Sequence, residues 1–165
     1  MKKLKSKTLE KAVIDVLKYT PYEPFLCLPL STLLYVLLKD KYQFDAKLVT
    51  GDLKFKTDYI FKQDFKISEA KDGVLTEWSG HSWVEIDNLI CDLSIFRTLY
   101  SDQFTKPCKA ELIANFGEGR GCLIFEKDKI QPGQLSYIAI DYLPDEMAIG
   151  ILKGFRDYHP ALAVS

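Results

Sequence analysis

A leucine-rich stretch, Leu28–Leu38, constrains the fold of this chain more than any other feature. Its leucines follow the i, i+3, i+4, i+7, i+8 spacing of an amphipathic helix that begins near Cys27, and Pro29 falls in the first turn, where its missing N–H is harmless. The stretch is far shorter than the ~20 residues that a membrane span needs. We therefore expect a buried helix that packs against another layer, and no membrane span.

Composition and charge narrow the class of protein. The chain has 165 residues and is 47% hydrophobic, which predicts a single domain over residues 1–165 with its own core. Its 22 Lys and Arg nearly balance 23 Asp and Glu, so nucleic acid is not an expected partner. No apolar stretch or cleavage site follows the basic N-terminus, so we expect no signal peptide and a cytoplasmic protein.

The four cysteines, at positions 27, 91, 108 and 122, match no zinc-binding or C-x-x-C redox spacing. In a reducing compartment we expect free thiols, at least three of them serving as small core residues. The chain also contains no calcium loop of the D-x-D-x-D-G type. We therefore expect no bound metal and no cofactor.

The remaining patterns predict an α+β fold. Helices are expected over 8–18, 109–116 and 145–158, and strands over 46–50, 81–86, 89–93, 122–126 and 136–142. The first of these strands should stop at Gly51. Residues 53–76 are rich in Lys and aromatic side chains without a clear period, so they are expected to form either a strand pair or an excursion over the core.

Cys27 stands at the start of the leucine-rich helix, on its inward face. The thiolate is the reactive form of a cysteine, whose free pKa is about 8.5. A helix N-terminus and a neighbouring imidazolium both lower that pKa. Position alone favours a buried helix cysteine, so a catalytic role depends on whether an imidazole and a carboxylate lie nearby.

A short hairpin over residues 81–93 can bring an imidazole and a carboxylate together. If Asp87-Asn88 is a two-residue turn, Ile86 pairs with Leu89. His81 and Asp92 then project from the same face as diagonal neighbours, within reach of a hydrogen bond if the ribbon twists. The alternatives are a hydrogen-bonded strand histidine and a solvated acid at a strand edge.

These segments together resemble the core of the transglutaminase-like superfamily. The resemblance rests on Cys27-Leu-Pro-Leu-Ser, Ala46-Lys-Leu-Val-Thr-Gly51, Gly80-His-Ser-Trp-Val-Glu-Ile86 and Ile90-Cys-Asp92, and it covers residues from about 24 to 94. The Cys-Leu-Pro-x-Ser opening is especially similar to lasso-peptide leader peptidases. The resemblance implies a papain-like fold, with the cysteine-bearing helix packed on an antiparallel sheet. It also implies a triad of Cys27 as nucleophile, His81 as base and then acid, and Asp92 as the residue that orients the imidazole.

The chain departs from this pattern in the groups that stabilise an oxyanion. No Gln precedes Cys27, and Trp78 and Trp83 lie far downstream of it. The Cys27 backbone N–H can supply one donor, and we expect Tyr22 or Tyr19 to supply another. Trp83 is expected in the core or the wall of a cleft, with a substrate contact as the lesser alternative. The C-terminal third matches no part of the family pattern and is expected to extend the same domain.

The expected function is a cysteine-dependent amide hydrolase or acyl transferase acting on a peptide or protein, with hydrolysis favoured because the chain is small. The alternative is a catalytically inactive relative that binds a peptide or partner protein in the same cleft. A third interpretation is a structural subunit in which all four cysteines belong to the core.

Overall fold

The computed structural model describes residues 2–69, 78–117, 121–129 and 134–158. Its α-helices are α1 (Lys2–Tyr19), α2 (Cys27–Val36), α3 (Ile95–Leu99), α4 (Lys109–Phe116) and α5 (Asp145–Tyr158). A π-helical turn, η1 (Leu37–Lys41), continues α2, and η2 (Ile67–Glu69) is a 3-10 turn. The strands are β1 (Ala46–Phe55), β2 (Asp58–Phe61), β3 (His81–Ile86), β4 (Leu89–Asp92), β5 (Leu123–Glu126) and β6 (Leu135–Leu143).

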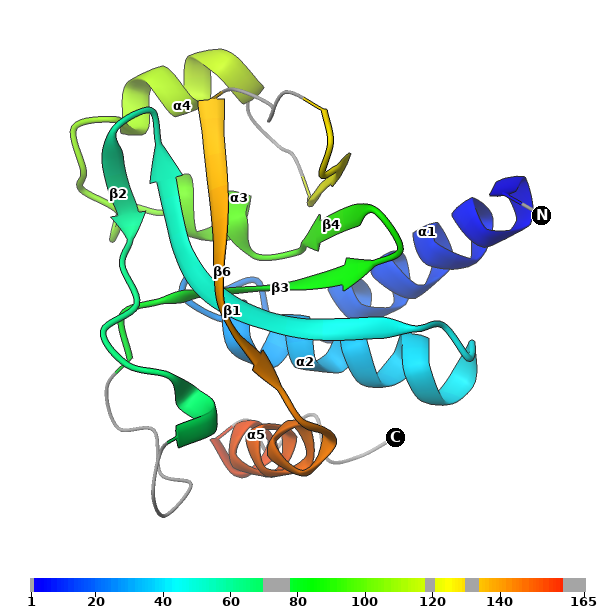
Figure 1. Ribbon diagram of the computed structural model, residues 1–165. Coiled ribbons are helices and arrows are strands. Elements are labelled where there is room, and N and C mark those ends of the chain that lie inside the picture. Colours follow the sequence, from blue (N-terminus) through cyan, green and yellow to red (C-terminus); the bar gives the residue numbers. More distant parts are fainter. Residues whose placement is uncertain (1, 70–77, 118–120, 130–133, 159–165) are drawn as a thin grey trace.

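The strands form one curled antiparallel sheet in the order β2-β1-β3-β4-β5, and β6 also pairs with β1 (Figure 1). The predicted register of the hairpin is confirmed, because Ile86 pairs with Leu89 and Val84 with Cys91. Asp87 has a φ of 50°, as a tight hairpin turn requires. The α+β class is therefore confirmed, together with an antiparallel sheet.

Two hydrophobic cores lie on opposite sides of the sheet. The first packs α1, α2 and α5 against β1, β3 and β4, and it includes Leu30, Leu34 and Val84. The second joins α3 and α4 to β2, β5 and β6 around Phe96 and Leu112. Figure 1 shows α2 and α5 below the sheet and α4 above it. The leucine-rich helix α2 therefore packs its apolar face against one side of the sheet, as the spacing of its leucines predicted.

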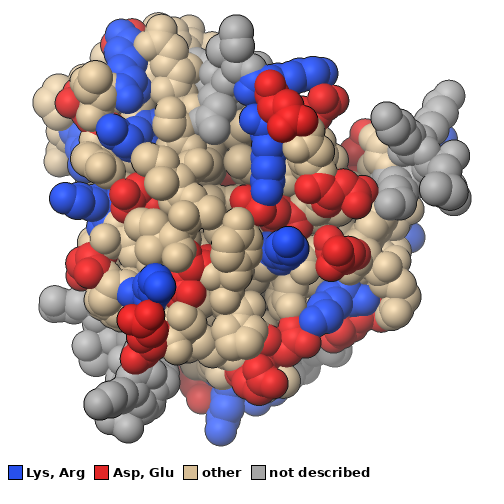
Figure 2. All heavy atoms as spheres, viewed as in Figure 1, with Lys and Arg blue, Asp and Glu red and all other residues tan. Residues whose placement is uncertain are grey.

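Acidic and basic side chains are interspersed over the face drawn in Figure 2. None of the helices in the described part of the chain has the length and apolarity that crossing a bilayer requires.

The prediction that the first strand stops at Gly51 is wrong, because β1 continues to Phe55. Gly51 pairs with His81 on one side and with Ala139 of β6 on the other, next to an irregularity in the β1–β6 register. A Cβ atom at position 51 would lie 2.0 Å from the carbonyl oxygen of Ile138. Glycine is therefore required here for close approach of two backbones, and it does not end the strand.

Other differences concern segments without a strong pattern. Helix α1 begins at Lys2, earlier than the predicted residue 8. The ambiguous segment 53–76 holds the end of β1, strand β2 and η2, while residues 70–76 lie outside the described ranges. The short helix α3 was not anticipated, and it proves important for the candidate site.

Gly51→Ala is expected to destabilise the protein by about 3 kcal/mol, because β6 has to move away from β1 to accommodate the methyl group. Gly154→Ala in α5 is the control, since open space surrounds that position, and a helical Ala should add about 0.5–1 kcal/mol. Urea denaturation measures both. A neutral Gly51→Ala would contradict the close approach of β6.

Candidate functional site

The hairpin brings His81 and Asp92 together at one end of β3 and β4. Nε2 of His81 donates to Oδ2 of Asp92 over 2.6 Å, and both side chains are fully buried. Trp83 and Ile90 project from the same face of the ribbon and pack in a small cluster with Val49. The diagonal contact expected from the register therefore forms, and it forms away from solvent.

The Asp92 carboxylate accepts hydrogen bonds at both of its oxygen atoms. Its Oδ1 accepts the backbone N–H of Ser94 at 3.0 Å, that of Ile95 at 3.1 Å and the Ser94 hydroxyl at 3.1 Å. Its Oδ2 accepts the hydroxyl of Tyr137 at 2.7 Å in addition to His81. Burial alone would raise the pKa of Asp92, but His81, Tyr137 and the Ser94 amide lower it. The carboxylate is thus ionised in the interior.

The ionised carboxylate controls the charge of the imidazole. Burial alone would lower the pKa of His81, whereas the charge and hydrogen bond of Asp92, followed by contacts with Cys27, raise it to about 10. The imidazole of His81 is therefore protonated on both nitrogens and positively charged at neutral pH. Its other ring nitrogen, Nδ1, makes no well-formed hydrogen bond with any described residue.

Cys27 lies at the first residue of α2 and is 9% exposed. Its thiol is close enough to His81 to raise the pKa of the imidazole. The first amides of a helix lack intrahelical acceptors, and the helix dipole places partial positive charge there. Cys27 therefore lies both at the start of α2 and beside the imidazolium of His81.

Helix α3 holds the bend that leads into Cys27. The guanidinium of Arg97 donates to the carbonyls of Pro21 at 2.6 Å and Leu17 at 3.2 Å, and to the hydroxyl of Thr20 at 3.3 Å. The backbone N–H of Phe25, a residue with a φ of 61°, donates to the hydroxyl of Thr98 at 3.0 Å. Asp92 caps α3 through the Ser94 and Ile95 amides, so it is linked to the cysteine as well as to the histidine.

Aromatic rings enclose the imidazole. The ring of Phe61 is stacked on His81, with centroids 5.0 Å apart and planes at 10°. The centroid of the His81 ring lies 6.3 Å from that of Trp83 and 6.1 Å from that of Tyr137. These rings exclude water from the His81–Asp92 pair and so strengthen its electrostatic interaction. Sequence reasoning missed Phe61, Tyr137 and Arg97, because each reaches the site only through tertiary contacts.

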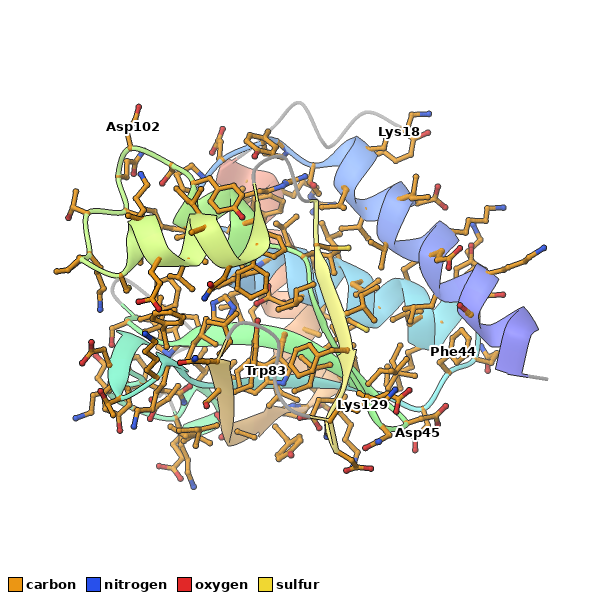
Figure 3. All side chains as sticks on the ribbon, turned by 90° about the horizontal axis from the view of Figure 1, so that it is seen from above. Lys18, Phe44, Asp45, Trp83, Asp102 and Lys129 are labelled. Carbon is orange, nitrogen blue, oxygen red and sulfur yellow. The ribbon has the colours of Figure 1, made fainter. Side chains whose placement is uncertain are left out.

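Trp83 and Tyr22, the two candidates for a substrate contact, occupy different environments. Trp83 is fully buried in the middle of the molecule, while Lys18 and Asp102 lie at its edge (Figure 3). The Nε1–H of Trp83 donates to Oε1 of Glu85 at 3.3 Å, and Trp83 therefore belongs to the core. Tyr22 is 71% exposed in the bend before Cys27, with the Arg97 guanidinium 5.2 Å from its ring centroid.

The donor set of the described residues shows no metal centre, since no group of three or more His, Cys, Asp or Glu side chains converges among them. All four cysteines are free thiols. Burial raises the pKa of Cys91 to about 12, helped by the charges of Cys122 and Asp92. Cys91 is therefore a core residue whose thiol stays protonated.

Comparisons with known proteins gave no match to a family model, a curated protein or a solved structure. The inference of function therefore depends on the geometry of Cys27, His81 and Asp92.

The imidazole of His81 is expected to remain protonated through neutral pH and to titrate near pH 10. Because its folded-state pKa lies above the unfolded value of 6.5, its contribution to stability is complete below pH 6.5 and is lost as the pH rises toward 10. Asp92→Asn should lower the pKa of His81 strongly, because the variant lacks the carboxylate charge that raises this pKa and the opposing effect of burial then dominates. NMR titration of the imidazole in a His159→Ala background measures both, and a wild-type signal that titrates near 6.5 contradicts the pair.

Tyr137→Phe is expected to reduce the free energy of unfolding by about 1.5–3 kcal/mol, the usual range for a hydrogen bond to a charged group. The matched control is Tyr42→Phe, because the buried Tyr42 hydroxyl has no partner among the described residues and its removal should be nearly neutral. Urea denaturation compares the two variants. Equal effects would show that the Tyr137–Asp92 contact does not stabilise the carboxylate.

Proposed function

We propose that this chain is a cysteine-dependent amide hydrolase or acyl transferase that acts on a peptide or protein amide. The observation that carries the proposal is the buried His81–Asp92 pair, with Nε2 and Oδ2 2.6 Å apart, beside a cysteine at the start of a helix. Papain-like enzymes use this combination, in which a carboxylate or amide orients the imidazole and the imidazolium supports the thiolate.

The proposed reaction has two steps. The Cys27 thiolate attacks the carbonyl carbon, the C–N bond breaks, and the His81 imidazolium gives its proton to the leaving amine. His81, now neutral, takes a proton from water as the water attacks the thioester, and the C–S bond breaks to release a carboxylic acid. An amine in place of water would give acyl transfer. Asp92 stays ionised throughout and stabilises the imidazolium.

The same residues support a transglutaminase-like, papain-like arrangement as the finer description of the fold. Helix α2 carries Cys27 and packs against an antiparallel sheet whose neighbouring strands carry His81 and Asp92. The order along the chain agrees with that family's pattern of cysteine helix, histidine strand and aspartate strand. Four free thiols suit the reducing conditions of the cytoplasm, where we place the protein.

A second candidate function is an inactive relative that binds a peptide or partner protein. The observation that favours it is the burial of the reacting groups, since His81 is 0% and Cys27 only 9% exposed. An active site has to admit a substrate carbonyl to Cys27. Reactivity of the thiol in solution separates the two functions.

Iodoacetamide labelling followed by mass spectrometry gives that measurement. At neutral pH, Cys27 should be alkylated at least about tenfold faster than Cys108, because among the described residues only Cys27 has an imidazolium partner. Cys108 is the internal control: it is the more exposed thiol, and burial raises its pKa. His81→Ala should abolish the advantage of Cys27, and Asp92→Asn should reduce it.

The acyl step is tested with 4-nitrophenyl acetate, which should give a burst of 4-nitrophenolate and a mass spectrum with acetyl on Cys27. Cys27→Ser should remove the burst. If Cys27 is labelled no faster than Cys108 and no acetyl form accumulates, the proposed catalytic function is wrong.

A further inference from the structure

Gln63 is a buried polar residue whose side chain has no hydrogen-bond partner in the part of the chain that the structure describes. It is 8% exposed, and neither its Oε1 nor its Nε2 forms a hydrogen bond with any described residue. Burying an amide donor and acceptor without partners costs about 1–3 kcal/mol for each group left unpaired. A carboxamide kept in this state points to a ligand that completes its hydrogen bonds.

Several contacts place Gln63 next to the candidate site. Two residues before it, the ring of Phe61 is stacked on His81 with centroids 5.0 Å apart. The carbonyl of the preceding residue, Lys62, accepts the hydroxyl of Ser79 at 2.5 Å, two residues before His81.

The backbone of Gln63 is itself anchored on the other side. Its N–H donates over 2.7 Å to Oδ1 of Asp52, which follows the Gly51 that pairs with His81. Gln63 is therefore held between the segments that flank His81 on β3 and on β1. These contacts use the backbone N–H of Gln63 and the backbone carbonyl of Lys62, and the Gln63 carboxamide takes part in neither of them.

The chemistry of a carboxamide defines the complementary ligand. Its NH₂ group donates and its carbonyl accepts, so a ligand that satisfies both atoms must offer an acceptor and a donor side by side. A peptide group or primary carboxamide does so, whereas an ester or a carboxylate offers acceptors only.

We propose that Gln63 binds an amide group of the substrate and makes the site selective for amides over esters. The proposal rests on the proposed function and adds to it the residue that selects the amide. Gln63 is then a residue that touches substrate.

Two neutral alkylating reagents isolate this contact. Iodoacetamide and methyl iodoacetate both form an S–CH₂ bond with Cys27 and expel iodide, while the thiol proton passes to base. Only the amide reagent offers N–H donors. Each rate for Cys27 is divided by the rate for Cys108 in the same sample, which removes the intrinsic reactivity of the reagent.

The normalised rate in wild-type protein should favour iodoacetamide by about two- to tenfold, the effect of one net hydrogen bond. Gln63→Leu should remove this preference. It should also leave the melting temperature unchanged or raise it, because an unpaired buried amide is replaced by an apolar side chain. Tyr42→Phe, which removes another buried group without a partner among the described residues, is the control and should keep the preference.

The same ratio in wild type and Gln63→Leu overturns the role of Gln63, for instance if its carboxamide binds only water. That result differs from failure of the proposed function, in which Cys27 reacts slowly with both reagents; the ratio still reports on Gln63 in that case. A second measurement needs no variant: acetamide, but not methyl acetate, should slow labelling of Cys27 in wild-type protein. Equal protection by the two compounds also overturns the proposal.

Discussion

The Asp92 carboxylate is the constraint on which the rest of this site depends. A buried charge is tolerated only when all its lone pairs are used, and here Oδ2 accepts from His81 and Tyr137 while Oδ1 accepts from Ser94 and Ile95. These partners belong to β3, β6 and the start of α3. One ionised group therefore joins β3 and the start of α3, which lie close to it along the chain, to Tyr137 of β6, which lies 45 residues later. The loss of any of these partners removes a hydrogen bond from a buried charge.

The same carboxylate helps to position both reactive groups of the candidate site, the imidazole of His81 and the thiol of Cys27. Through Oδ2 it keeps the imidazole of His81 protonated and oriented. Through Oδ1 it caps α3, whose Arg97 and Thr98 hold the bend before Cys27. The positions of the imidazole and the thiol consequently depend on each other, because both are held through contacts with the Asp92 carboxylate.

Local patterns were sufficient for the parts of the structure that local forces decide. The Asp87-Asn88 turn sets the hairpin register, and the leucine spacing sets the buried face of α2, so the meeting of His81 with Asp92 was predictable. Gly51 misled because a glycine signals a turn as readily as the close approach of another backbone. Phe61 and Tyr137 were missed because no pattern in the sequence tells which strands β2 and β6 join, and the choice of β1 is a tertiary one.

The place of Tyr137 in β6 has a consequence for synthesis of the protein. A ribosome makes the segments with Cys27, His81 and Asp92 well before it makes the strand that closes over them. Until β6 has emerged and joined β1, the carboxylate lacks its hydrogen bond from the Tyr137 hydroxyl. The buried surroundings of the His81–Asp92 pair are thus completed only after residue 143, the last of β6, has been synthesised.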